Sequence, residues 1–206
     1  MIEALLKGVA ISLLLVFSVG PVIFTIIKQS ITNGKAGGFS FVSGVWVSDS
    51  LWAVLGNAFS SLVAALLHCE RQIGFVGGLF LIALGVYYLF FKKIKIDESG
   101  LPIKSGSHLK LFTSGFLVNT LNPGVIIFWL TLATAFAGYT WLQRIIIFST
   151  CILINVGSDI LKVVLADRVS DKLTVKNISL ISKISGLLLL VFGIALLLGF
   201  HLTTSH

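Results

Sequence analysis

Charged residues are scarce in this chain. Asp, Glu, Lys and Arg make up 11% of its 206 residues, whereas an ordinary soluble domain contains about 25%. Most of the other residues are apolar, and the mean hydropathy is +1.04. This composition predicts an integral membrane protein. Because a helix needs roughly 20 apolar residues to cross a bilayer core of about 30 Å, the chain has room for about six crossings and none for a soluble catalytic domain.

Cysteines are few, and several catalytic motifs are missing. Cys69 and Cys151 are the only cysteines and lie far apart without a C-x-x-C motif, so neither a redox pair nor a cysteine-based metal site is indicated. The sequence has no Walker A loop, no H-E-x-x-H motif and no G-x-S-x-G motif. These absences argue against an ATPase, a zinc protease and a serine hydrolase. We therefore expect a protein that is not an enzyme and that holds no cofactor and no metal centre.

Long apolar segments alternate with short polar connections. They predict an all-α membrane protein with six transmembrane helices in a single polytopic domain over residues 1–206. The expected segments are approximately Ala4–Ile27, Gly38–Leu67, Ile73–Phe91, Leu111–Ala135, Ile145–Leu165 and Ile178–Phe200.

Basic residues gather in alternate connections between these segments. The net charge of +7 would suggest a nucleic-acid partner for a soluble protein, but here most Lys and Arg fall in the first, third and fifth connections, with Lys28 and Lys35 assigned to the first. By the positive-inside rule these connections face the cytoplasm and both termini face outward. The third connection, about residues 92–110, is expected to be a flexible cytoplasmic loop. No nucleic-acid partner is expected.

One apolar segment is interrupted by Asn119, Asn122, Pro123 and Gly124. Proline lacks a backbone donor and disturbs the preceding helical turn. Hydrocarbon offers no water to replace the lost hydrogen bond, so such a break survives only inside protein or beside an aqueous cavity. Asn119 and Asn122 are three residues apart and can bond to freed backbone groups, to a neighbouring helix or to a ligand. A proline kink held by the Asn amides, with no ligand, is the alternative.

The two halves of the chain resemble each other. Val47–Leu55 aligns with Gly157–Leu165, and the preceding segments contain Gly20–Pro21 and Asn122–Pro123, respectively. This predicts two three-helix repeats, about residues 1–91 and 111–206. Because each repeat crosses the membrane an odd number of times, the two copies must be inverted. Inverted repeats with interrupted helices in matching positions are typical of transporters whose site lies between the repeats near the bilayer midplane.

Two carboxylates, Asp49 and Asp159, lie deep in the expected spans. Each costs at least about 2.5–3.5 kcal/mol there and is usually functional or paired. Lys162 follows Asp159 by three residues and Asn155 precedes it by four, so the spacing predicts an Asp159–Lys162 ion pair. A purely structural pair is the alternative. Asp49 has no cation within one turn and is the better candidate for a proton carrier, unless it pairs with a distant Lys or a backbone group.

Glycines and tryptophans also fall at expected helix depths. Gly34–Gly38 and Gly74–Gly78 each contain a G-x-x-x-G motif, which favours close helix packing, although Gly34–Gly38 could instead form a tight turn. Trp46, Trp52 and Trp129 are expected to line a cavity or fill the core.

Several of these residues follow the pattern of a known family. They are Gly20–Pro21, the glycines at 34, 37, 38 and 44 before Asp49, Gly77, Gly78 and Gly85, and Gly115-x-x-x-Asn119-x-x-Asn122-Pro123. With them the chain resembles the LysE/RhtB family of bacterial amino-acid exporters. The resemblance implies a six-helix secondary exporter in the bacterial cytoplasmic membrane that expels amino acids or related small metabolites at the expense of an ion gradient. Ser48 and Gly124 depart from the pattern, because the family usually has Gly and often Lys at these positions.

Together these features predict an alternating-access exporter. The substrate carboxylate would meet half-helix amino ends and amide groups, and the expected substrate-binding residues are Gly20, Pro21, Asn119, Asn122 and Pro123. Asp49 and Asp159 would exchange protons or bind the substrate's amino group. The expected partners are a small-molecule substrate and the lipid bilayer, with a homodimer left open.

Three alternatives remain at this stage. Oxygen ligands from the two Asp and the Asn carbonyls would suit export of a divalent metal cation. A membrane thiol-redox carrier would have to use Cys69 and Cys151. A purely structural membrane subunit is the last alternative, and the two carboxylates within the membrane argue against it.

Overall fold

The described part of the chain is entirely helical. The computed structural model describes all residues except 18–20, 59–69, 92–106, 171–174 and 203–206. These residues form seven α-helices and one short π-helix: α1 (Ile2–Phe17), α2 (Pro21–Ala58), α4 (Glu70–Val86), η1 (Tyr87–Phe91), α5 (His108–Thr120), α6 (Pro123–Ala135), α7 (Trp141–Ser170) and α8 (Val175–Leu202). The predicted all-α fold is confirmed, whereas the six crossings and the inverted repeats stay predictions.

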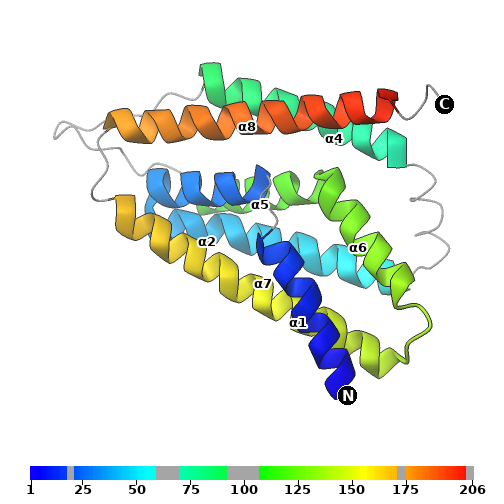
Figure 1. Cartoon of the computed structure of the whole chain (residues 1–206). Helices are drawn as coiled ribbons and strands as arrows, with labels where there is room; N and C mark the ends of the chain where they lie inside the picture. Colours follow the sequence, from blue (N-terminus) through cyan, green and yellow to red (C-terminus); the bar gives the residue numbers. More distant parts are fainter. Residues whose placement is uncertain (18–20, 59–69, 92–106, 171–174, 203–206) are drawn as a thin grey trace.

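Helix α2 consists of two helical parts joined at Gly34. This residue has φ 70° and ψ −178°, a backbone conformation that glycine adopts without steric cost. A Cβ atom on Gly38 would overlap Ser30 Oγ, although residues eight apart lie about 12 Å from each other along a straight helix. The chain therefore folds back on itself at Gly34, as the dark and light blue parts of α2 show in Figure 1. The Gly34–Gly38 segment thus forms the tight turn considered above.

The first connection is shorter than the sequence suggests, because the helix before it continues past Lys28 to the turn at Gly34. Lys28, assigned there to a cytoplasmic connection, lies within α2 with 0% of its surface exposed. The polar side chains near it form hydrogen bonds to the preceding helical turn: Ser30 Oγ donates to Ile26 O (2.8 Å), and Asn33 Nδ2 donates to Gln29 Oε1 (2.7 Å). Because polar side chains bonded to the preceding turn do not end a helix, the polar composition was misleading. Lys35 also lies in α2, just after the turn.

Two expected segments are each divided between two helices. The first segment is shared by α1, which ends at Phe17, and α2, which begins at Pro21. The fourth is shared by α5 and α6, which meet at an angle of 61°. Pro21 and Pro123 both stand at the first position of a helix, where the missing N–H leaves no hydrogen bond unmade. Gly20, the partner of Pro21 in the predicted break, lies outside the described residues.

Among the described residues, two helices are long and apolar enough to cross a membrane, namely α2 and the Trp141–Arg168 part of α7. The bent pair of α5 and α6 would make a third. Helix α2 has 38 residues and would measure about 57 Å if it were straight, nearly twice a bilayer core of about 30 Å. Its turn at Gly34 therefore lets it contribute to two crossings.

The helices pack in two groups (Figure 1). Helices α4 and α8 lie side by side, while α2 contacts α5, α6 and α7, and α1 lies against α7. Gly78 and Gly85 face α8, where added Cβ atoms would come within 3.1 Å of Gly193 O and 2.7 Å of Gly186 O. The close helix packing predicted from the glycines of this segment is therefore present.

The tightest helix contact brings α2 and α5 together. A Cβ atom on Gly115 would overlap Phe41 O, and one on Gly44 would overlap Phe112 O. The two backbones therefore touch directly. One turn beyond Gly115, this contact brings Asn119 against the part of α2 that carries Asp49.

We predict that Gly115→Ala destabilises the protein, because the added methyl group has to displace the backbone of α2. Overpacking of this kind costs about 1–3 kcal/mol. The matched control is Gly157→Ala, since no atom lies within 4 Å of the added Cβ there. Thermal unfolding of both variants in detergent tests this expectation, and equal unfolding temperatures would show that the α2–α5 contact is looser than described.

Candidate functional site

Asp49 is almost fully buried in the second part of α2, with 6% of its surface exposed. Its Oδ1 atom accepts hydrogen bonds from Asn119 Nδ2 (2.7 Å) and Trp129 Nε1 (3.0 Å). Its Oδ2 atom accepts one from Asn155 Nδ2 at 3.2 Å. The donors come from α5, α6 and α7, so three helices converge on one carboxylate. These N–H groups take the place of the water molecules that would solvate an exposed carboxylate.

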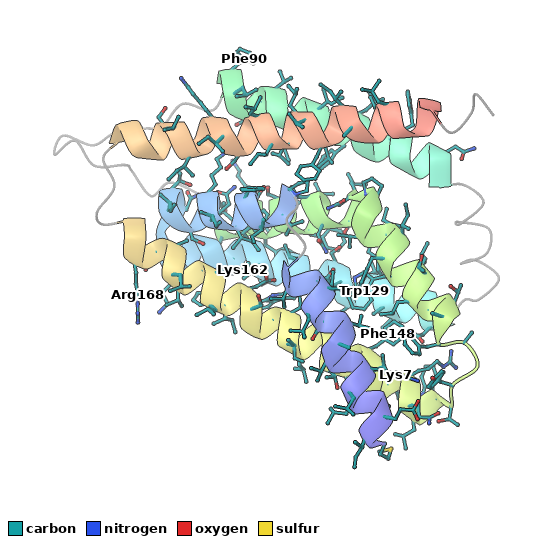
Figure 2. The ribbon with its side chains drawn as sticks, in the orientation of Figure 1. Lys7, Phe90, Trp129, Phe148, Lys162 and Arg168 are labelled. Atoms are coloured by element: carbon teal, nitrogen blue, oxygen red, sulfur yellow. The ribbon has the colours of Figure 1, made fainter. Side chains whose placement is uncertain are left out.

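Asp159 is the second buried carboxylate, with 3% of its surface exposed. Its Oδ1 atom lies 3.0 Å from Lys162 Nζ, which forms the ion pair that the sequence spacing predicts. Its Oδ2 atom accepts a hydrogen bond from Trp46 Nε1 at 3.2 Å. Figure 2 places Lys162 where α7 faces α2, whereas Arg168, further along α7, points away from the bundle.

Each carboxylate is held by a tryptophan from the other half of the chain. Trp129, from the second half, donates to Asp49 in the first half. Trp46, from the first half, donates to Asp159 in the second half. The sequence indicated that both tryptophans lie deep, but it did not reveal these bonds. The partners are 80 and 113 residues apart, and no local spacing relates them.

The two carboxylates share one small pocket of about 80 Å³. Polar residues form part of its lining: Asp49, Asn119, Asn122, Asn155, Asp159 and Lys162. Apolar residues form the rest: Leu15, Val22, Ile23, Ile26, Val45 and Val125. The structure therefore gathers five of the sequence-predicted site residues and adds Asn155, which the sequence placed only on the face of Asp159. Pro21 and Pro123 are buried at the adjacent helix ends but do not line the pocket.

The size of the pocket limits what fits in this conformation. Its volume of about 80 Å³ is well below the roughly 300–1,000 Å³ of usual ligand pockets. This conformation therefore offers less room than a typical ligand site.

The two asparagines at the helix break have different partners. Asn122 precedes α6 and caps it, because its Oδ1 atom accepts a hydrogen bond from Gly124 N at 3.1 Å. Asn119 bonds to a neighbouring helix through the carboxylate of Asp49. Of the roles that the sequence left open, Asn122 therefore bonds to a backbone group freed by the break, and Asn119 bonds to the adjacent helix. The amino end of α6, with its partial positive charge, begins beside the pocket.

The two departures from the family pattern lie close to this break. Ser48 is fully buried, and its Oγ atom accepts a hydrogen bond from Thr120 Oγ1 at 2.7 Å. This bond ties α2 to the end of α5 immediately before the break. Gly124 is exposed, and a Cβ atom there would lie 3.4 Å from Asn122 Oδ1. The cation in the pocket is instead Lys162, which reaches it from α7.

The oxygen ligands considered for a metal cation line this pocket, whereas Cys151, considered for thiol chemistry, does not. Within the described ranges, no three His, Cys, Asp or Glu side chains come together as a metal-binding group. Cys151 is buried as a free thiol in the cluster that contains Trp129 and Phe148. Cys69 lies outside the described residues.

Comparison with protein families gives one match that covers most of the chain. Residues 13–199 match the model of a family described as LysE type translocator. The matched region contains the helix break, both carboxylates and Lys162. No curated protein and no solved structure matches the chain.

We predict that Trp129→Phe lowers the stability of the protein through the lost bond to Asp49. Hydrogen bonds to charged groups contribute about 1.5–3 kcal/mol and are roughly twice as strong as neutral ones. The part of this loss of stability that comes from the hydrogen bond should therefore be about halved when Asp49 is replaced by Asn. A double-mutant cycle of thermal stability in detergent measures this coupling. Equal losses in both backgrounds would mean that Trp129 only fills space.

Proposed function

Because the chain belongs to the LysE-type translocator family, we propose that it exports amino acids across the bacterial cytoplasmic membrane in exchange for protons. Family membership makes it a multi-pass membrane transporter that exports small molecules such as amino acids, and not an enzyme. The proposal adds the inverted-repeat architecture, the proton coupling and the residues of the site.

Helix packing supports two inverted repeats. Helix α1 of the first half lies against α7 of the second half, and α5 of the second half lies against α2 of the first. The leading half-helix of each repeat thus packs on the second helix of the other repeat. Helices α4 and α8, the third in each repeat, pack against each other. The six crossings would be α1 with 21–33, 35–58, α4 with η1, α5 with α6, α7, and α8.

The observation that carries the proposal is the meeting of Asp49 and Asp159 in one pocket beside two broken helices. These residues occupy matching positions in the two aligned segments and line the same pocket. Leu15 and Val22 border it from either side of the first break, and Asn119 and Asn122 border it at the second. Charged groups within the membrane that face such a pocket are typical of substrate and proton pathways.

The chemistry of the pocket suits an amino acid. A carboxylate of the pocket can hold an ammonium group, and the amino end of α6 favours a negative group. Asp49 forms no salt bridge with a described residue. A proton that binds there removes a buried negative charge, so proton binding relieves part of the cost of burial. Asp49 is therefore the proposed proton carrier.

A divalent metal cation suits the pocket less well. Calcium and magnesium sites gather several oxygen ligands and usually more than one carboxylate. In this pocket Asp159 is already paired with Lys162, and a metal ion would be repelled by that ammonium group. A substrate that carries its own carboxylate is instead attracted by the ammonium group of Lys162.

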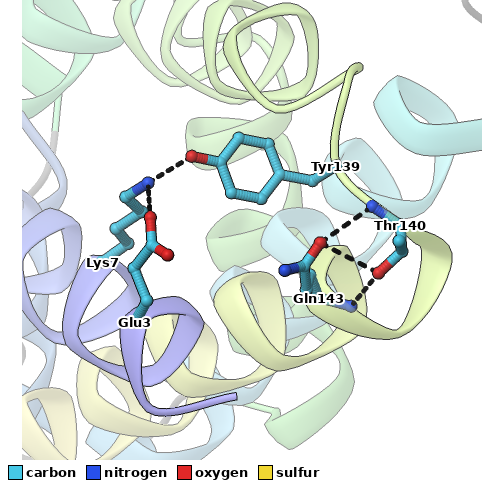
Figure 3. Close-up of polar contacts among 5 residues, drawn as sticks. All are labelled: Glu3, Lys7, Tyr139, Thr140 and Gln143. Atoms are coloured by element: carbon cyan, nitrogen blue, oxygen red, sulfur yellow. Dashed lines mark hydrogen bonds and ion pairs between the residues drawn. The ribbon is translucent and has the colours of Figure 1, made fainter.

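Contacts at the amino end of α1 support the proposed orientation. Lys7 Nζ bonds to Glu3 on the preceding turn and to the hydroxyl of Tyr139 in the connection between α6 and α7 (Figure 3). The amino terminus and this connection therefore lie at the same end of the bundle. The positive-inside rule places that end outside the cell, and six crossings bring the carboxyl terminus to the same side.

We predict that a cysteine at position 205 is labelled from outside the cell and one at position 99 is not. The experiment uses Ser205→Cys and Ser99→Cys in a background with Cys69→Ser and Cys151→Ala. Intact cells are treated with a membrane-impermeant maleimide, and lysed cells serve as the control for reactivity. Labelling of position 99 in intact cells would contradict the orientation.

We predict that inverted membrane vesicles containing the protein accumulate labelled amino acids when a proton gradient is imposed, and that Asp49→Asn abolishes this accumulation. The amide cannot exchange a proton, but it preserves the size of the side chain, and its oxygen can still accept the bonds from Asn119 and Trp129. Glu3→Gln is the matched control, because Glu3 is an exposed carboxylate that does not line the pocket. Accumulation of divalent cations alone, or normal amino-acid accumulation by Asp49→Asn, would contradict the proposal.

A further inference from the structure

We propose that the two carboxylates of the pocket have separate tasks: the Asp159–Lys162 pair binds both charges of the amino acid, and Asp49 carries only the proton. This division rests on the proposed function. The sequence already favours Asp49 as the proton carrier, because Lys162 follows Asp159 by three residues, and the surroundings of the two carboxylates in the structure also differ.

The Asp159–Lys162 pair presents one negative and one positive group to the pocket. The charged atoms are 3.0 Å apart, and the side chains are 4% and 19% exposed, respectively. Among the described residues that line the pocket, Lys162 is the one cation. Trp46 holds the second oxygen of Asp159, which leaves the first oxygen to the ammonium group of Lys162. An amino acid can replace each partner, with its ammonium on Asp159 and its carboxylate on Lys162.

This exchange favours molecules that carry both charges. A buried ion pair that loses one partner is strongly destabilised, because the other charge remains without compensation. An amine that bound to Asp159 would leave the charge of Lys162 unpaired. A carboxylic acid that bound to Lys162 would leave the charge of Asp159 unpaired. A zwitterion leaves both charges paired. The pair therefore discriminates by charge pattern, and it can do so for many side chains.

Asp49 is poorly suited to hold an ammonium group. An ionised carboxylate offers about four lone-pair positions, and N–H donors from Asn119, Trp129 and Asn155 already use three of them. A proton is a different ligand, because it converts an acceptor oxygen into a donor. Protonation of Asp49 would therefore weaken its bonds to α5, α6 and α7 together and loosen the contact between the halves. Asp159, Lys162 and Cys151 are the other titratable groups near it in the described structure.

Two transport assays separate the tasks. Gradient-driven accumulation needs both proton and substrate binding, whereas exchange of labelled for unlabelled amino acid across vesicles without a gradient needs only substrate binding. We expect Asp49→Asn to lose accumulation and to retain exchange. Asp159→Asn combined with Lys162→Met should lose both, with exchange falling more than about 100-fold, as expected for the loss of a buried charge pair. Because the double variant removes both charges, it leaves no unpaired charge to prevent folding.

Competition in the native protein tests the charge pattern without any substitution. The competitors are the transported amino acid, the amine without its carboxylate and the acid without its amino group, all with the same side chain. We expect only the amino acid to inhibit exchange. Equal inhibition by the amine, or loss of exchange in Asp49→Asn with retention in the double variant, would overturn the division while leaving amino-acid export intact. Absence of any amino-acid exchange in the native protein would overturn the proposed function as well.

Discussion

The need to satisfy buried charge without water governs this structure. Asp49 and Asp159 lie within helices that belong to a membrane protein, and hydrocarbon supplies no hydrogen-bond donors. Every donor must therefore come from the protein itself. Asp49 receives its bonds from α5, α6 and α7, and Asp159 receives its bonds from α2 and α7. The carboxylates thereby specify how these four helices are placed around the pocket.

Close backbone contacts make these bonds geometrically attainable. Asn119 reaches Asp49 because Gly44 and Gly115 let α2 and α5 touch without intervening side chains. A similar close contact forms at the turn inside α2, where Gly38 lies against both Ser30 and Val163. Small residues are enriched at helix contacts in membranes because packing, rather than burial of apolar surface, holds such helices together. In this protein the same contacts also orient the polar groups.

Broken helices place polar groups next to the pocket at acceptable cost. Pro123 begins α6 and Asn122 caps it, so the backbone groups freed by the break find partners in the protein. The pocket that borders the break measures only about 80 Å³, less than a usual ligand pocket of about 300–1,000 Å³. Transport therefore requires the helices around the pocket to separate, and the bonds that converge on Asp49 join the two halves that would have to move. In our proposal, the residue that holds the halves together is also the residue that binds the proton.

Local spacing and composition allowed the sequence alone to predict the helical membrane fold, the break at Pro123 and the Asp159–Lys162 pair, because each depends on residues within one or two helical turns. The sequence misplaced Lys28, because polar residues after an apolar run have the composition of a loop. Their hydrogen bonds to the preceding turn, which keep them in a helix, are visible only in the structure. Only the tertiary structure revealed that Trp129 and Asn155 bind Asp49 and that Trp46 binds Asp159. These partners are 80 to 113 residues apart. Their contact depends on how whole helices pack, which no short-range pattern encodes.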